Sequence, residues 1–326
     1  MLLNLRRVLR FRFHWSSEIY GLGKTYRSWL GLPRWVPLLF TSDHGVLLGQ
    51  AIDPELTKPK WVSIPHLTWT VDNMSLPEMG VDRLFLPVVH PWVTYRRARN
   101  YGAGAANSGC GTVFFPIHTA GGVITKGIND RDSIEYLKKL DEHFEPIQIC
   151  MHFGEFNSER AREFQNAGFN VTTVGDPSKG DFVDNFYGLL GRFKYVISEN
   201  YGSQVPFAVE YGIPVQILPR EISEFSATSG EELVGPSHPG YANNISRAQE
   251  LFQDLPSSIS LDQISWAEER LGLANEKHSS KVKRKVLLWT LKYSVVWAVK
   301  DLFFNNLKVI TVLFLNELKI GQRREK

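Results

Sequence analysis

The clearest candidate for ligand binding is a loop that joins a predicted strand to a predicted helix. The apolar segment Tyr195–Ser198 ends in a hydroxyl residue, and Gly202 and Ser203 then open a helix that runs to Tyr211. The free N–H groups and the dipole at a helix start attract phosphate, and a glycine lets a ligand approach the backbone. We therefore expect Ser198, Gly202 and Ser203 to bind a phosphate group. The competing interpretation is that Ser203 only caps its helix, because serine is a favoured N-cap residue.

A second candidate follows the predicted strand Gly111–Pro116, where Ile117 leads to His118 and Thr119. A partly buried histidine can donate a hydrogen bond to a phosphate and gain charge as a leaving group departs. We expect His118 and Thr119 to contact the same phosphate as the helix start. The competing interpretation is a structural histidine that bonds to a loop carbonyl.

A candidate general base lies in the loop Ser42-Asp43-His44-Gly45. Transfer to an acceptor hydroxyl requires a group that takes its proton, and the imidazole of His44 can do this near neutral pH. Asp43 can take the proton instead, or orient the imidazole. The same residue types also form ordinary turns.

Four further polar residues are candidates for lining the same cleft, namely His90, His152, Glu199 and Asn200. His90 precedes Pro91, which suits the first turn of a helix, so the competing interpretation is a helix start. No spacing of His, Cys, Asp and Glu is typical of a tight metal site, and Asp130-Arg131-Asp132 is expected to form an N-cap. We therefore expect neither a metal nor a cofactor.

These candidate residues must be positioned by strands that alternate with helices. Between residues 111 and 220 we expect five strands, at Gly111–Pro116, Pro146–Met151, Asn170–Val174, Tyr195–Ser198 and Pro214–Leu218. We expect the helices between them at Asp132–His143, Asn157–Ala167, Phe182–Leu190 and Ser203–Tyr211. This order predicts βαβ units and a parallel sheet. Open sheets of this kind bind ligands at the carboxyl ends of their strands.

The rest of the chain predicts a second set of strands and a helical end. We expect strands at 35–40, Trp61–Ile64 and Arg83–Leu86, a helix at Trp92–Asn100, and a short amphipathic helix within residues 1–30. The glycine-rich residues 101–110 are expected to form a linker. Residues 221–245 are expected to be a polar loop, 261–272 a helix, and 286–318 one or two long helices. The expected domains are 1–105, 106–275 and a tail at 276–326.

Charge is distributed unevenly along the chain. The net charge is +3, but residues 1–40 carry +6, residues 281–326 carry +8 and the residues between them carry −11. An acidic body with basic ends argues against a nucleic-acid groove and favours attachment to an anionic membrane surface through residues 281–326. That segment can lie on a bilayer or pack over the protein. With two cysteines and no secretory signal, we expect a cytoplasmic protein, peripheral on the inner face of the plasma membrane.

The segment from Tyr195 to Val215 resembles the donor-phosphate block of GT-B-type glycosyltransferases. In that family a short Ser-Gly-Ser loop, a helix and a Gly-x-Pro-Val turn hold the phosphates of a nucleotide donor. Here the sequence from Ser198 to Ser203 and then Gly212-Ile213-Pro214-Val215 take those places. The similarity is good over about 190–220 and, by the order of strands and helices, extends to about 111–220. Related UDP-sugar 2-epimerases have acidic residues early in this helix, where this chain has Pro206 and Phe207, so epimerase chemistry is disfavoured.

The segment Gly111–Thr119 resembles a histidine-containing motif of bacterial capsule-type transferases, including polysialyltransferases and CDP-glycerol glycerophosphotransferases. The loop Ser42–Gly45 resembles a loop in the first lobe of the same enzymes. The resemblance implies an α/β fold with two Rossmann-like lobes, GT-B-like, and a basic amphipathic helical tail. It also implies metal-independent transfer of a sugar from a nucleotide-sugar donor to a surface polysaccharide or lipid-linked glycan. The alternatives are a CDP-polyol phosphotransferase, a UDP-sugar 2-epimerase-like enzyme and a non-catalytic scaffold.

Overall fold

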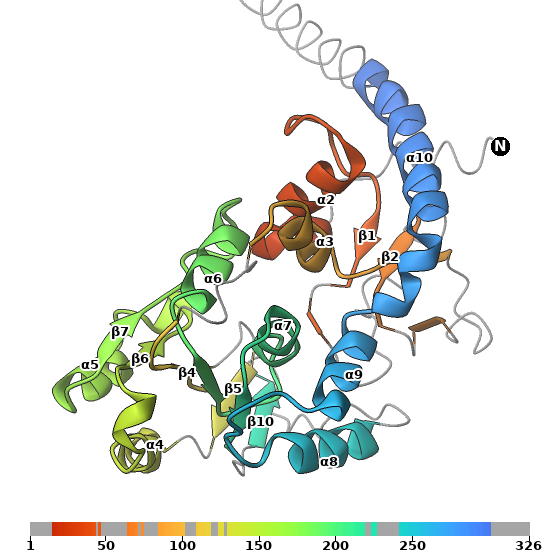
Figure 1. Cartoon of the computed structure of the whole chain (residues 1–326). Coiled ribbons are helices and arrows are strands. Elements are labelled where there is room, and N and C mark those ends of the chain that lie inside the picture. Colours follow the sequence, from red (N-terminus) through yellow and green to blue (C-terminus); the bar gives the residue numbers. More distant parts are fainter. Residues whose placement is uncertain are drawn as a thin grey trace, which may run out of the picture.

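The protein has a mixed α/β fold that contains two parallel sheets (Figure 1). The computed structural model describes residues 15–43, 45–46, 64–70, 73–74, 84–101, 109–118, 123–126, 129–218, 223–226 and 241–300. The candidate base His44, the candidate phosphate ligand Thr119, most of the expected linker and residues 301–326 of the expected tail lie outside these ranges. The domain boundaries near 105 and 275 stay predictions.

The larger sheet has five parallel strands in the order β7-β6-β4-β8-β9. These are β4 (Thr112–Phe115), β6 (Ile147–Cys150), β7 (Asn170–Thr172), β8 (Tyr195–Ser198) and β9 (Val215–Ile217). The strand that comes first along the chain, β4, is central, and the order of connection reverses between β4 and β8. In open α/β sheets the crevice at such a reversal is the usual place for a ligand. The prediction of a parallel sheet built from βαβ units is confirmed.

Helices cover both faces of this sheet, because successive strand residues point to opposite sides. The helices are α4 (Asp130–Leu137), α5 (Glu159–Asn166), α6 (Phe182–Leu190) and α7 (Gln204–Tyr211). On one face Phe114 and Ile197 pack with Phe164 of α5. On the other face Val113 and Val196 pack with α6 and α7. The expected helix at Asp132–His143 is shorter than predicted, and a short 3₁₀ helix (Glu142–Phe144) follows it.

The smaller sheet has three parallel strands, β1 (Thr41–Ser42), β2 (His66–Thr68) and β3 (Phe85–Pro87), in that order. Each lies further along the chain than expected, and the predicted strand at 35–40 is wrong. Proline has no N–H to donate to a ladder, and pairing begins where the N–H of Thr41 donates to the carbonyl of Pro65 at 3.0 Å. The helices α2 (Leu22–Leu30) and α3 (Pro91–Ala98) pack against each other next to this sheet.

Three elements were not predicted from the sequence. The strands β5 (Val123–Lys126) and β10 (Ser223–Ser226) form a small antiparallel sheet, and α8 (Tyr241–Phe252) follows. The expectation of a loop over 221–245 is therefore wrong at both of its ends. The sequence of β10 is polar and pairs with a strand almost a hundred residues away, whereas α8 buries Ala248 and Phe252, which are four residues apart on one helical face.

One hydrophobic cluster joins the two sheets. It includes Tyr26 and Trp69 beside the smaller sheet, Trp92 of α3, and Phe186 and Phe207 beside the larger sheet. The ring of Trp92 stacks on that of Phe207 with centroids 4.9 Å apart. The two parallel sheets therefore share a continuous apolar core at their junction.

The chain ends its described part with α9 (Leu261–Arg270) and the long helix α10 (Ser279–Lys300). Figure 1 shows α10 passing along β1 and β2 and then rising beyond the body of the protein. Trp289 ties it to the body, because its Nε1–H donates to the carbonyl of Leu39 at 2.8 Å. Among the helices that the structure describes, none has the length and apolar character needed to cross a membrane.

Candidate functional site

A cavity of about 300 Å³ lies at the carboxyl ends of β4, β6 and β8, where the two sheets meet. Its polar and backbone wall consists of Gly45, His90, His118, His152, Gly202, Ser203 and Gln204. Its aromatic wall consists of Tyr20, Trp92, Phe115, Phe182, Phe186 and Phe207. The structure thus brings together His118 and the helix start at Gly202-Ser203, which are more than eighty residues apart in the sequence.

The start of α7 is open to this cavity. Ser203 occupies the N-cap position, but its side chain makes no capping hydrogen bond. Its Oγ instead accepts the N–H of Val46 at 3.0 Å, which links α7 to the loop that follows β1. The interpretation of Ser203 as an ordinary cap is therefore wrong. Because Oγ accepts from Val46, the hydroxyl proton is left for a further acceptor.

Ser198 and Asn200 stabilise the loop before α7 through hydrogen bonds with each other and with Gln204. Ser198 is fully buried, donates to the carbonyl of Asn200 at 2.8 Å and accepts from Nε2 of Gln204 at 2.7 Å. The side-chain amide of Gln204 also donates to Oδ1 of Asn200 at 2.9 Å. Neither Ser198 nor Asn200 lines the cavity. Both residues set the shape of the loop that presents Gly202 and Ser203.

Two histidines form a stacked pair in the opposite wall. The rings of His118 and His152 have centroids 4.5 Å apart and planes 3° apart, and they follow the neighbouring strands β4 and β6. Burial, and then the positive charge that His152 can carry, lower the pKa of His118 to about 4. Nδ1 of His152 accepts the N–H of Gly154 at 3.2 Å, so Nε2 carries the proton of its neutral ring. At neutral pH His118 is therefore uncharged.

The peptide of Ile117 fixes the backbone before His118 from both sides. Its N–H donates to Oε2 of Glu199 at 2.9 Å, and its carbonyl accepts from Nη1 of Arg160 at 2.5 Å. Arg160 also forms a two-pronged pair with Asp130, at 2.5 and 2.6 Å. Glu199, expected to face the cleft, is instead buried behind the His118 loop.

Asp130 itself does not have the role expected from the sequence. The N-cap of α4 is Asn129, and Asp130 is the first helical residue. The expectation that the Asp130-Arg131-Asp132 segment caps the helix is therefore wrong. The reason is that the carboxylate of Asp130 forms an ion pair with the guanidinium of Arg160 on α5, thirty residues further along the chain.

Asp43 is the centre of a buried polar cluster. Its carboxylate accepts from Nε2 of His66 at 2.9 Å, Oγ1 of Thr68 at 2.6 Å and Nδ2 of Asn73 at 3.1 Å. The backbone N–H groups of the two residues after Thr68 also donate to it. Asp43 does not line the cavity, and the imidazole that it orients is that of His66. The loop continues to Gly45, which does line the cavity.

His90 both starts a helix and lines the cavity, so the two interpretations considered for it are compatible. Its Nδ1 accepts the N–H of Trp92 at 3.2 Å, so it caps α3 as the ordinary interpretation predicts. It also lines the cavity, where its ring lies against Trp69 and Phe207. Complete burial lowers the pKa of His90 well below its ordinary value, so its ring is neutral.

Two groups of ionic contacts join the elements on either side of the cavity. Arg96 of α3 pairs with Glu210 of α7 through hydrogen bonds of 2.9 and 2.5 Å. Lys24 of α2 pairs with Asp184 of α6, which also accepts from the hydroxyl of Tyr95 at 3.0 Å. Burial alone would raise the pKa of Asp184, but the hydrogen bonds from Lys24 and two tyrosines lower it overall. These contacts hold α2 and α3 against α6 and α7.

Some wall residues were missed by sequence reasoning. Gln204 follows directly after Ser203, so its place in the first helical turn is a signal that could have found it. The rings of Tyr20, Phe182 and Phe186 carry no such signal, because the sequence marks them only as parts of apolar helical faces.

The cavity wall contains no Lys or Arg side chain among the residues that the structure describes. Nor do the described residues include a group of three or more His, Cys, Asp or Glu placed to hold a metal ion. An anionic ligand would therefore be held by neutral donors, namely imidazole N–H, hydroxyl and backbone N–H groups. Comparison of the sequence with models of known protein families and with curated proteins gave no match in either case.

Proposed function

We propose that the protein is a metal-independent glycosyltransferase with a two-lobed, GT-B-like architecture. It would transfer a sugar from a nucleotide-sugar donor to a surface polysaccharide or a lipid-linked glycan. One observation carries the proposal: His118 after β4 and Gly202-Ser203 at the start of α7 face one cavity at the reversal point of the five-stranded sheet. Nucleotides bind at this place in sheets of this order.

The two walls of the cavity suit the two parts of a nucleotide. The aromatic wall offers ring faces to a base, and an aromatic contact contributes about 1–3 kcal/mol per stacked base. The N–H groups at the start of α7, the hydroxyl of Ser203 and the imidazoles of His118 and His152 suit the phosphates. A cavity of about 300 Å³ is at the lower end of the range for ligand pockets. It therefore suits the nucleotide part of a donor.

His118 is placed to assist departure of the nucleotide. In the free protein its pKa is about 4, and an adjacent phosphate raises the pKa of an imidazole because it stabilises the charged form. The imidazole would thus donate a hydrogen bond to the leaving phosphate and gain positive charge as that phosphate gains negative charge. The base for the acceptor hydroxyl remains His44 in this proposal, since its neighbour Gly45 lies in the cavity wall.

The helix after Ser203 disfavours the epimerase alternative. Phe207 lies in the cavity wall with its ring on Trp92, and Glu210 is paired with Arg96. Neither residue can supply a free carboxylate to a donor ribose or sugar. A CDP-polyol phosphotransferase would use the same phosphate contacts as a glycosyltransferase. The structure therefore does not distinguish these two activities, and an experiment must.

The test is binding of nucleotides to the full chain. Melting temperature would be measured with CMP, CDP, UDP and GDP, and saturation at a hundredfold excess over the dissociation constant stabilises the protein by about 2.7 kcal/mol. We expect His118→Asn to reduce the response, whereas His278→Asn, which changes an exposed histidine that does not line the cavity, should not. Absence of a response to all four nucleotides would refute the proposal. Hydrolysis of CDP-glycerol in preference to sugar nucleotides would favour the phosphotransferase.

A further inference from the structure

The helix α10 is apolar on two opposite faces. Val282 and Val286 lie on the buried face, which packs on the protein. Leu288, Leu291 and Val295 are 57, 46 and 65 % exposed. Their spacings of three, four and seven residues place them on one face of the helix. An exposed stripe of large apolar side chains is a mark of an interaction site.

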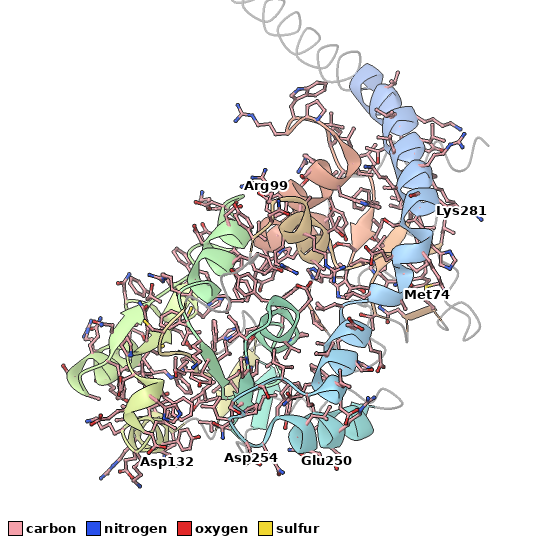
Figure 2. All side chains as sticks on the ribbon, in the orientation of Figure 1. Met74, Arg99, Asp132, Glu250, Asp254 and Lys281 are labelled. Atoms are coloured by element: carbon pink, nitrogen blue, oxygen red, sulfur yellow. The ribbon has the colours of Figure 1, made fainter. Side chains whose placement is uncertain are left out.

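The exposed face of α10 is also strongly basic. Lys281, Arg284, Lys285 and Lys292 are exposed, and they lie beside or between the apolar residues of the stripe. The sequence of α10 contains six Lys and Arg residues and no Asp or Glu. Figure 2 labels Lys281 on the outer side of the helix, at the edge of the molecule. The partner of this face must therefore tolerate apolar insertion and carry negative charge.

A second segment presents the same chemistry. Trp35 is the most exposed of the large aromatic side chains that the structure describes, at 79 %, and its neighbour Arg34 is exposed as well. The segment joins α2 to β1 and is tied to α10 by the hydrogen bond from Trp289 to the carbonyl of Leu39. Figure 1 shows this segment at the end of the molecule where α10 rises. Tryptophan is enriched where protein meets the bilayer interface.

We propose that α10 and the segment at Arg34-Trp35 together form a docking surface for an anionic lipid bilayer. The apolar side chains enter the boundary between headgroups and acyl chains, and the long basic side chains reach the lipid phosphates. A protein partner fits the surface less well, because lysine is depleted in the cores of protein interfaces. The inference does not depend on the proposed transferase activity, since none of these residues lines the cavity.

The test is sedimentation of the full-length protein with lipid vesicles. We expect binding to vesicles of phosphatidylcholine mixed with phosphatidylglycerol, weaker binding to phosphatidylcholine alone, and weakening by salt. The variant Leu288→Ser/Leu291→Ser/Val295→Ser and the variant Trp35→Ser should each bind about tenfold more weakly or worse. Each of Lys281→Gln and Lys292→Gln should weaken binding about fivefold.

The control is Leu261→Ser, which removes a side chain that is 83 % exposed on α9 and should leave vesicle binding unchanged. Because all substituted residues are exposed, the variants should keep the wild-type melting temperature and the wild-type response to nucleotides. Equal binding of the wild type and the stripe variant to the mixed vesicles would overturn the proposal. So would a dimer in sedimentation velocity that the stripe variant dissociates while neither protein binds vesicles, since the surface would then contact a second copy of the chain.

Discussion

The arginine beneath the His118 loop gives the sharpest test of how the site is built. Arg160 lies on α5 with a side chain that is largely buried, and it donates to Asp130, to the carbonyl of Ile117 and to Glu155. Replacement by methionine keeps an unbranched apolar stem, lacks the guanidinium group and so removes all of these hydrogen bonds. The buried carboxylate of Asp130 then loses its cation, and the peptide before His118 loses one of its two supports.

The expected loss of stability follows from these contacts. Hydrogen bonds to charged groups contribute about 1.5–3 kcal/mol each, and removal of one partner from a buried ion pair costs about 3–5 kcal/mol. We therefore expect Arg160→Met to lower the free energy of unfolding by about 3–5 kcal/mol, out of a total that is about 5–15 kcal/mol for most proteins. The double variant Arg160→Met/Asp130→Leu should lose less than the sum of the single changes, because it also removes the stranded charge.

Urea unfolding of the variants measures this loss, and the nucleotide-induced rise in melting temperature measures the position of His118. The control is Arg162→Met, two residues along the same helix, where the side chain is exposed and a change within about 0.5 kcal/mol is expected. If Arg160→Met were no less stable than Arg162→Met, the network would not carry the loop. If it were less stable but kept the full nucleotide response, Arg160 would stabilise the fold without positioning His118.

Three further predictions concern the cavity and the sheet. His118 has a pKa of about 4 when folded and about 6.5 when unfolded, so the unfolded state binds more protons between these values. Stability should thus fall as the pH drops from 6.5 towards 4, and less so in His118→Gln. Ser203→Ala should lower the free energy of unfolding by about 1 kcal/mol and weaken nucleotide binding, unlike Ser280→Ala, which changes an exposed residue of α10. Gly111→Ala should destabilise more than Gly168→Ala, because φ is positive at both but only at Gly111 would a Cβ lie 2.1 Å from a backbone carbonyl oxygen.

Each of these predictions has an outcome that contradicts it. Parallel stability curves of the wild type and His118→Gln between pH 4 and 7 would show that burial of this ring does not control its protonation. A nucleotide affinity unchanged in Ser203→Ala would show that this hydroxyl does not contact the phosphates in the way we propose. Equal unfolding free energies for the two glycine variants would mean that the backbone of Gly111 and Pro146 can move to accept a side chain.

Local sequence patterns sufficed for the five-stranded sheet and failed for the elements that depend on distant partners. Four of the five strands in that sheet, β4, β6, β8 and β9, are short and mostly apolar. Gly212 ends α7 in the left-handed conformation that glycine favours. The strands of the smaller sheet were displaced by a few residues, because their pairing starts beside prolines. The strand β10 was missed because its sequence is polar and its partner lies about a hundred residues away. The strand β5 begins with Val123-Ile124-Thr125, a local strand signal that the prediction overlooked.

In the candidate site, too, residues with a local sequence signal were predicted and residues that act through distant contacts were not. His118, Gly202 and Ser203 were found because they follow strand ends, a place that topology alone brings to one edge of the sheet. The role of Arg160 had no sequence signal, since it depends on contacts with α4 and with the backbone of Ile117. Ser198 and Glu199 were expected to face the ligand, but both turn inward to hold the loops that do.

The absence of a fixed cation from the described wall of the cavity has a consequence for selectivity. A free inorganic anion that entered would lose its hydration and gain only neutral donors in return, so simple salts should compete poorly for this space. A molecule that carries both a flat ring and an anionic group can contact the aromatic wall and the polar wall at once. Stacking of the ring then supplies binding free energy that a cation would otherwise supply. Recognition here would therefore begin with the nucleoside and only then extend to the charge.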